Sequence, residues 1–508
     1  MTEPIGTFCL VLHTHLPWLA HHGSWPVGEE WLHQAWAQSY QRVLGVVDRL
    51  ADEGRTELLT LGVTPVVAAQ LDDPYCLGLQ RTWLADWHWR AMGMTAETDR
   101  TTRTLGRWEA EQARAAALDF DRWSSGGSPI LRTVADAGAV ELLGGPLAHP
   151  FSPLLDPDVL DFELAAGLHD ARLRTGRRPG GIWAPECGYR PGLADHYARA
   201  GISHFMVDGP TLRHIGASTA EAHPVGDTGV LAFGRDLDVT YRVWSPRRGY
   251  PGGKWYRDFH SYDHRWGFRH NRVTSTQTPT HEKAPYDPEA ARAAALRDAQ
   301  DFVATVRARL ADIRRERDGR PGMTVAAYDT ELFGHWWYEG PQWLEHVLRL
   351  LPQAGVRVTT LAGAIAAGLV GEPIEPTSGS WGSGKDWHVW DGEGVHDIVA
   401  DNARAQARTL ELLKRVEPGS GRDPVADQLV RDLVLSLQSD WAFMVSHDSA
   451  AGYARDRHAA HHWALAELTD HIEEHGWQDP ATRALARRQR QVDGPFGHID
   501  ARLLGQRH

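Results

Sequence analysis

The chain has 508 residues, of which 42% are hydrophobic and 23% charged, and its formal net charge is −13. This length exceeds one compact core of ordinary size, and the apolar content is sufficient to fold it throughout, so we expect an ordered enzyme with several lobes. Because the negative net charge is combined with Lys and Arg residues dispersed among Asp and Glu, a nucleic-acid partner is disfavoured.

The cysteines and the N-terminal sequence indicate the compartment. The three cysteines, Cys9, Cys76 and Cys187, form no C-x-x-C pair, which argues against a zinc or redox motif and fits a reducing cytoplasm. The first residues lack a basic segment followed by an apolar stretch, and the longest run of small apolar residues, 361–370, is too short to span a bilayer. We therefore expect a cytoplasmic protein with no membrane partner.

Short apolar segments alternate with helical patterns along the chain. The predicted strands are residues 8–13, 58–62, 140–143, 182–184, 205–207, 239–244, 323–328 and 356–359. Such alternation predicts a parallel sheet wrapped by helices, and seven or eight strands favour a closed or nearly closed barrel. The helix before the seventh strand is clear, because the Asp-Pro pair at 287–288 offers a cap and a first-turn proline before apolar residues at helical spacing.

Two regions depart from this alternation. Residues 76–130 are rich in Trp and helical in pattern, which predicts a helical insertion between barrel segments 1–75 and 131–391. Residues 392–508 show no strand pattern and predict an all-helical C-terminal domain, with amphipathic helices at 401–416, 423–437 and 455–474.

Polar residues at the carboxyl ends of barrel strands are the first candidates for catalysis, because barrel enzymes place the active site on that face. His13 and His15 follow the first strand, and their alternation points both side chains the same way. This pair could bind a metal, hydrogen-bond a substrate or be structural. Further along, the strand at 140–143 runs into a Gly-Gly turn that delivers His149.

Two other strand ends deliver carboxylates. Glu186 lies in a Trp-Ala-Pro-Glu-Cys-Gly sequence, in which Pro and Gly can fix the backbone so that one side chain is aimed. Asp329 ends the strand at 323–328 and is followed by a His-Trp-Trp sequence. A lone Asp is usually a capping or salt-bridged residue, but two strand-end carboxylates beside Trp and His clusters favour catalysis. A fifth segment, 377–391, is rich in Gly, Ser and Trp, and is too aromatic for a plain linker.

Together the five segments resemble the five sequence regions of glycoside hydrolase family 57, in order and over nearly the whole chain. Within that family the chain is most similar to the α-1,4-glucan branching enzymes, through its His-x-His-x-Pro start, its Trp-Ala-Pro-Glu-Cys strand, its Tyr-Asp-x-Glu-x-Phe-Gly-His strand and its Trp-rich fifth region. The resemblance implies an α/β fold, an incomplete (β/α)7 barrel with a helical insertion and an all-helical C-terminal domain. It also implies no cofactor and an α-glucan as the partner.

Residue roles follow from the same resemblance. Glu186 is implied to be the nucleophile and Asp329 the general acid/base. The residues expected to bind the glucan are His13, His15, His149, Trp183, Tyr250, Trp266, His335, Trp381, Trp390, Asp440 and Trp441. Because the first three are implied to hydrogen-bond the sugar, no metal is expected. The segment 438–441 resembles the part of the family's helical domain that reaches back to the cleft.

The chemistry of retention agrees with these roles. It needs two carboxyls about 5 Å apart, one ionised to attack the anomeric carbon and one protonated to release the leaving sugar. Repulsion between them helps to keep Asp329 protonated until Glu186 forms the glucosyl ester. Attack by a 6-hydroxyl then makes an α-1,6 branch, whereas attack by water hydrolyses the chain. Residues 243–258 favour branching, because they resemble the mobile loop of branching enzymes, with Tyr250 near its tip.

Other functions remain open at this point. An α-amylase or a 4-α-glucanotransferase of the same family would differ only in the acceptor. A metal-dependent polysaccharide deacetylase could also use strand-end His and Asp, although two His and distant carboxylates make no compact ligand set. A glycan-binding protein without activity is disfavoured because both carboxylates are present. We expect a monomer or a small homo-oligomer.

Overall fold

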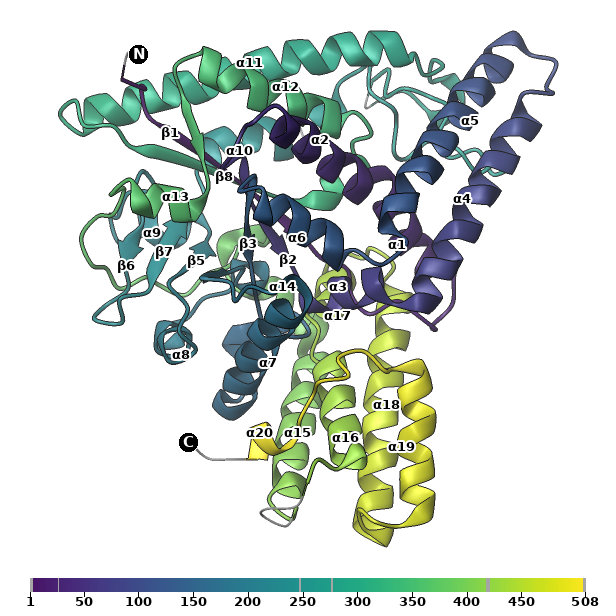
Figure 1. The fold of residues 1–508 in the computed structure, drawn as a ribbon, viewed down its shortest axis with the longest axis vertical. Coiled ribbons are helices and arrows are strands. Elements are labelled where there is room, and N and C mark those ends of the chain that lie inside the picture. The colour runs from purple at the N-terminus through teal and green to yellow at the C-terminus, as the bar shows by residue number, and fades with distance from the viewer. Residues whose placement is uncertain (1–2, 26, 246–247, 276, 417–420, 506–508) are drawn as a thin grey trace.

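The computed structural model describes residues 3–25, 27–245, 248–275, 277–416 and 421–505. Figure 1 shows a strand-containing body from which a pair of long helices and a column of C-terminal helices project. The strands of the body are β1 (Thr7–Thr14), β2 (Leu59–Val63), β3 (Val140–Leu143), β4 (Gly181–Ile182), β5 (His204–Val207), β6 (His223–Pro224), β7 (Leu231–Gly234), β8 (Met323–Asp329) and β9 (Arg357–Thr359).

Among the described residues, seven parallel strands follow one another around a ring. The order β3-β2-β1-β8 forms one sheet and β4-β5-β7 the other. A parallel bridge between Gly144 and Ile182 joins β3 to β4, and the backbone N–H of Asp236, just after β7, donates to the Val325 carbonyl of β8 at 2.8 Å. Among the described residues two backbone hydrogen bonds close the first seam and one closes the second, so the predicted incomplete seven-stranded barrel is confirmed. The short strands β6 and β9 pair with β7 and β1 outside the ring.

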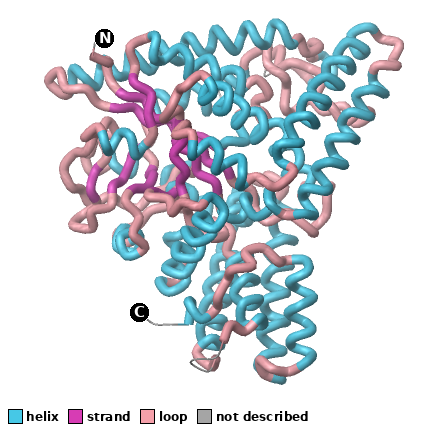
Figure 2. Tube along the Cα trace, viewed as in Figure 1, coloured by secondary structure: helices cyan, strands magenta, loops and turns pink. Residues whose placement is uncertain are grey.

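Helices cover the outside of the ring (Figures 1 and 2). The helices of the body are α1 (Glu29–Ala35), α2 (Gln41–Asp52), α3 (Pro65–Asp72), α6 (Ser128–Asp136), α7 (Pro157–Thr175), α8 (Leu193–Arg199), α9 (Gly209–Arg213), α10 (Leu237–Trp244), α11 (Pro288–Glu316), α12 (Gly340–Gln353), α13 (Leu361–Ala366) and α14 (His388–Asp391), of which α14 packs on the C-terminal helices.

Helix α11 begins where the sequence predicts it. The Asp287 side chain accepts the backbone N–H groups of Glu289 and Ala290, and Pro288 occupies the first turn. Phe302 and Val306 of this helix are fully buried against the barrel, so the cap and the apolar stripe together fix its start and its inward face.

The prediction of a strand at 239–244 is wrong, because these residues belong to α10. Asp236 caps this helix by accepting the backbone N–H groups of Asp238 and Val239, and the buried Val239 and Val243 lie one turn apart. The cap therefore overrides the strand preference of the β-branched residues. The strand that fills this place in the ring is β7, which the sequence analysis missed.

A helical insertion and an all-helical C-terminal part are present, as the fold prediction expects. Helices α4 (Pro74–Met94) and α5 (Arg100–Phe120) form the projecting pair. The C-terminal part contains α15 (His396–Leu413), α16 (Pro424–Ser436), α17 (Ser439–Ser446), α18 (Ala451–His475), α19 (Pro480–Val492) and α20 (Arg502–Gly505). Figure 2 shows no strand in the described residues of this part. No described helix combines the length and apolar character needed to cross a membrane.

Candidate active site

A cavity of about 1120 Å³ lies at the carboxyl ends of the parallel strands. This volume is sufficient for several sugar residues. The predicted site residues that line it are His13, His15, His149, Glu186, Asp329, His335, Trp381 and Asp440. They come from the ends of β1 and β8, from the segments after β3, β4 and β8, from the segment before α14, and from α17, so the fold gathers residues that are far apart in the sequence.

Glu186 sits on a strained turn after β4. Glu186 and Cys187 both have positive φ, 60° and 49°, which costs about 1–3 kcal/mol for each non-glycine residue. The residue is 7% exposed. Its Oε2 accepts the indole N–H of Trp381 at 2.8 Å, and its Oε1 accepts the hydroxyl of Ser439 at 2.7 Å. The turn thus aims one carboxylate into the cavity, as the Pro and Gly pattern predicted.

Asp329 is the last residue of β8 and lies in register with His13 of β1. Burial raises the pKa of Asp329, opposed by the Arg235 guanidinium. Burial also raises the pKa of Glu186, opposed by the hydrogen bonds from Ser439 and Trp381. The pKa of Glu186 is raised to about 8 and that of Asp329 to about 7, so the two carboxyls share protons near neutral pH. Two donors end on Glu186 and, among the described residues, no hydrogen bond ends on the Asp329 carboxyl, which favours Glu186 as the place of the negative charge when the pair carries one.

The three predicted histidines form a stack. The ring of His13 lies 4.4 Å from that of Trp183 and 4.9 Å from that of His149, and the rings of His149 and His15 are 3.7 Å apart. Burial lowers the pKa of His13 and His149 well below the usual range, so both are uncharged. Both nitrogens of His149 and the Nε2 of His13 are hydrogen-bonded within the protein, and His13 Nδ1 is buried, so the two rings add no charge to the cavity wall.

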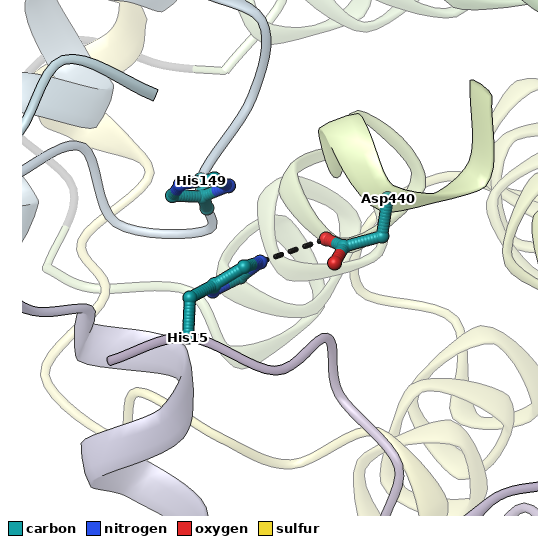
Figure 3. Close-up of side chains that lie close together, drawn as sticks. All are labelled: His15, His149 and Asp440. Carbon is teal, nitrogen blue, oxygen red and sulfur yellow. Dashed lines mark hydrogen bonds and ion pairs between the residues drawn. The ribbon is translucent and has the colours of Figure 1, made fainter. Parts of the chain in front are cut away.

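His15 connects the barrel to the C-terminal helices. Its Nε2–H donates to Asp440 of α17 at 2.8 Å, the contact drawn in Figure 3, and its Nδ1 lies within hydrogen-bond distance of the Thr64 hydroxyl, at 3.0 Å. Asp440 therefore faces the cavity from a helix that follows β1 by more than 400 residues.

Comparison with known proteins agrees with this arrangement. The model of a family described as glycosyl hydrolase family 57 matches residues 9–367. The chain belongs to this family. A second model, described as the C-terminal part of 1,4-alpha-glucan branching enzymes, matches residues 402–504.

Individual relatives point the same way. A Mycobacterium tuberculosis protein named probable 1,4-alpha-glucan branching enzyme is 53% identical, over 98% of each chain. The crystal structure of a family 57 branching enzyme from Pyrococcus horikoshii, 28% identical, superposes with a TM-score of 0.92 over 99% of this chain and 97% of its own. An α-amylase from Thermotoga maritima, 23% identical, superposes with a TM-score of 0.88 over 99% of each chain and shares the fold.

Several residues predicted to bind the glucan do not line the cavity of this family 57 chain. Trp183 is buried behind His13. Trp390 is buried and stacks on Phe151 at 4.8 Å. Trp441 is fully buried, and Trp266 lies against Gly93 of the insertion. These rings support the cavity wall or the domain contacts from behind, because sequence can mark an aromatic residue but not the side of a wall on which it packs.

Tyr250 is not at a loop tip in this structure. It is buried, and its hydroxyl donates to Asp301 of α11 at 2.5 Å. Its ring lies 6.1 Å from that of Trp343. The predicted loop folds onto α11 at this point, and Pro246 and Arg247 of the same loop lie outside the described residues. Nearby aromatic residues that do line the cavity are Tyr241, Trp244, Phe259 and Tyr262.

Two cavity residues, Arg235 and Glu331, and Ser439, which does not line the cavity itself, have no role in the sequence-based prediction. Arg235 follows β7, donates to the buried Asp208 at 2.8 Å and lies over the Trp381 ring. It was missed together with β7. Glu331 accepts from the Tyr40 hydroxyl at 2.5 Å, and Ser439 contacts Glu186. Glu331 and Ser439 lie inside motifs named above, so only the family resemblance could have identified them, and the resemblance implied no role for either.

Figure 3 shows the one described group in the cavity whose atoms approach one another as metal ligands do, His15, His149 and Asp440, within 4.8 Å. The two rings are stacked with their planes 23° apart. Imidazole lone pairs lie in the ring plane, so stacked rings cannot aim them at one ion. In addition, both ring nitrogens of His149 are hydrogen-bonded, to His13 and Ser439. The geometry favours hydrogen bonding over metal binding.

A second described group, His22, His461 and Asp493, lies between the barrel and the C-terminal helices. The guanidinium of Arg457 is 2.7 Å from His461 Nε2, and this positive charge disfavours a cation.

We therefore expect activity to be independent of metal. Dialysis against a strong chelator should leave the initial rate on amylose unchanged, because neither histidine group is arranged to hold an ion that the reaction needs. The measurement is the rate before and after dialysis, with the metal content of the protein determined in parallel. A loss of activity that zinc restores would contradict this expectation and favour the deacetylase alternative.

Proposed function

We propose that this protein is a retaining 1,4-α-glucan branching enzyme. It cleaves an α-1,4 bond of a glucan, holds the released chain as an ester on Glu186, and transfers it to a 6-hydroxyl of an acceptor. The observation that supports the chemistry is the convergence of Glu186 and Asp329 on one cavity at the strand ends. The match of residues 402–504 to the C-terminal part of branching enzymes supports the choice of acceptor.

In the first step, Glu186 attacks the anomeric carbon while Asp329 donates its proton to the glycosidic oxygen that departs. The ester consumes the charge on Glu186, and with it the repulsion that opposes ionisation of Asp329. In the second step, the ionised Asp329 takes the proton of the acceptor 6-hydroxyl as that oxygen attacks the ester-bound sugar. Two inversions at the same carbon retain its configuration.

The donors around the two carboxyls position the reacting sugar. His13, His15, His149 and Asp440 line the cavity, and the Asp440 carboxylate, which accepts from His15, has further lone pairs for sugar hydroxyls. The Trp381 ring lies beside Glu186, where a flat apolar face can pack against a pyranose ring. These contacts involve hydroxyls that a glucan offers on every residue, so we propose an α-glucan as the substrate.

Transfer must prevail over hydrolysis for branching to occur. The outer part of the cavity is lined by Trp25, Trp31, Phe259 and Tyr262, and the rings of Trp25 and Tyr262 lie 6.2 Å apart. An acceptor chain held between such rings would displace water and bring a 6-hydroxyl to the ester. The Thermotoga maritima α-amylase shares the fold, so hydrolysis and 4-α-glucan transfer are the alternatives that an assay must separate.

The setting in the cell is part of the proposal. We propose a cytoplasmic enzyme that acts on glycogen or a related glucan, as a monomer or a small homo-oligomer. The absence of a C-x-x-C pair and the buried state of all three cysteines fit a reducing compartment.

Incubation with amylose should produce α-1,6 linkages well in excess of new reducing ends. Linkages are measured from the anomeric proton signals of the product, and reducing ends by a colorimetric assay on the same samples. Reducing ends without α-1,6 linkages would mean an α-amylase. A change of chain-length distribution with neither product would mean a 4-α-glucanotransferase.

A further inference from the structure

Ser439 contacts the proposed nucleophile from the helical part of the chain. It is the first residue of α17, is 3% exposed, and places its Oγ 2.7 Å from Glu186 Oε1 and 3.0 Å from His149 Nδ1. Its backbone N–H donates to the His149 carbonyl at 3.1 Å. The hydroxyl is therefore held on both sides and has little freedom to turn elsewhere.

Glu186, Ser439, His149 and His13 form a row of hydrogen bonds. The direction of each bond follows from which atoms can carry a proton. The Trp381 indole can only donate, so Glu186 Oε2 carries no proton. If the single Ser439 proton goes to Oε1, its oxygen accepts from His149 Nδ1–H. The bare Nε2 of His149 then accepts from His13 Nε2–H, 3.0 Å away.

The opposite direction of the hydrogen bonds would leave a buried N–H without an acceptor. A proton on Glu186 Oε1 would donate to Ser439, Ser439 to His149 Nδ1, and His149 Nε2–H to His13 Nε2. The remaining proton of His13 would then sit on Nδ1, which is buried and has no hydrogen-bond partner among the described residues. His13 Nδ1 lacks a partner in either case, but a buried N–H without an acceptor is rarer in proteins than an unsatisfied acceptor. The hydrogen-bond network therefore favours the ionised form of Glu186, against the burial that raises the pKa of Glu186 to about 8.

We propose that Ser439 is a positioning residue that favours the ionised form of Glu186 and aims its carboxylate, with His149 and His13 fixing the direction of the Ser439 hydroxyl. This inference rests on the proposed role of Glu186 as nucleophile. It gives α17 a part in the reaction: the C-terminal helices supply the hydrogen bond that lets a buried carboxylate start the reaction with a negative charge. Of the influences that lower the pKa of Glu186 against the effect of burial, this hydrogen bond is the largest.

The proposal predicts a pH-dependent defect in Ser439→Ala. Without the donor, the pKa of Glu186 rises, so the acidic limb of kcat/KM on amylose should move upward by about one pH unit. The variant should lose about tenfold in kcat/KM on that limb, and the loss should shrink as the pH rises and Glu186 ionises. A purely structural role would reduce activity by the same factor at every pH.

The controls separate the hydrogen bond from the fold. Ser436→Ala removes another buried hydroxyl of the same region, which donates to the Leu433 carbonyl at 2.7 Å, and should leave the limb in place. Ser439→Thr keeps a hydroxyl and should restore the wild-type limb. If Ser439→Ala does not fold, Ser439→Cys, with a weaker donor, should shift the limb in the same direction by less.

An unmoved limb in a folded Ser439→Ala or Ser439→Cys protein, or a loss equal at all pH values, would overturn the inference. Glu186→Gln distinguishes the two proposals. If that variant is inactive and the Ser439 limb is unmoved, only the positioning role fails. If Glu186→Gln remains active, the proposed nucleophile itself is wrong.

Discussion

Glu186→Gln is expected to abolish transfer and hydrolysis together, by at least about a thousandfold, because an amide keeps the shape of the side chain but cannot form the glycosyl ester. The amide oxygen can still accept from Trp381, and the amide N–H₂ can donate to Ser439, so the fold should be kept. Both products are measured on amylose, and thermal unfolding tests the fold. Activity above about a few percent of wild type, without deamidation back to Glu, would contradict the assignment.

Glu163→Gln is the matched control for this variant. Glu163 of α7 is also buried, and burial raises its pKa to about 8, as it does that of Glu186, so the control matches the proposed nucleophile in burial and in electrostatics. Its Oε2 accepts the backbone N–H of Ala148 at 2.9 Å, a contact that an amide oxygen can also make. The side chain does not line the cavity, and its replacement should leave activity close to wild type.

The sequence predicts the two carboxyls well because each ends a strand. An apolar run specifies a strand, and a barrel brings all strand ends to one face, so Glu186 and Asp329 meet without knowledge of any contact. The same reasoning explains His13 and His149. This reasoning fails at 239–244. These residues have strand-forming side chains, but they form a helix because Asp236 caps it.

The supporting residues could not be predicted in the same way. Ser439 reaches Glu186 across 253 positions, through the packing of α17 against the barrel mouth, and no local pattern specifies that contact. Tyr250 is the converse case, a residue that the sequence places in the site and the structure does not. The glycines beside it predict a mobile loop, but its hydroxyl donates to Asp301 of α11 and its ring is buried. Local sequence indicates which side chains suit a role, whereas tertiary packing decides which of them reach the cavity.

Asp329→Asn should be nearly inactive on amylose yet keep part of its activity on a glucoside with a good leaving group. Without the acid, a sugar leaving group departs unprotonated and the first step is slowed by about 10²–10⁴-fold. A good leaving group needs no proton, so Glu186 can still form the ester. The ester should then accumulate, because no base activates the acceptor in the second step. A burst of leaving group followed by slow turnover is the expected time course.

Azide should relieve that second block, because an anion needs no general base and the lost charge at position 329 no longer repels it. The expected product is a glycosyl azide with the configuration of the substrate, since azide attacks a sugar already inverted once on Glu186. No described hydrogen bond fixes the Asp329 carboxyl, so its amide should perturb the neighbouring side chains little. If the Glu186 variant were the one that azide rescued with retained configuration, the roles of the two carboxyls would be reversed.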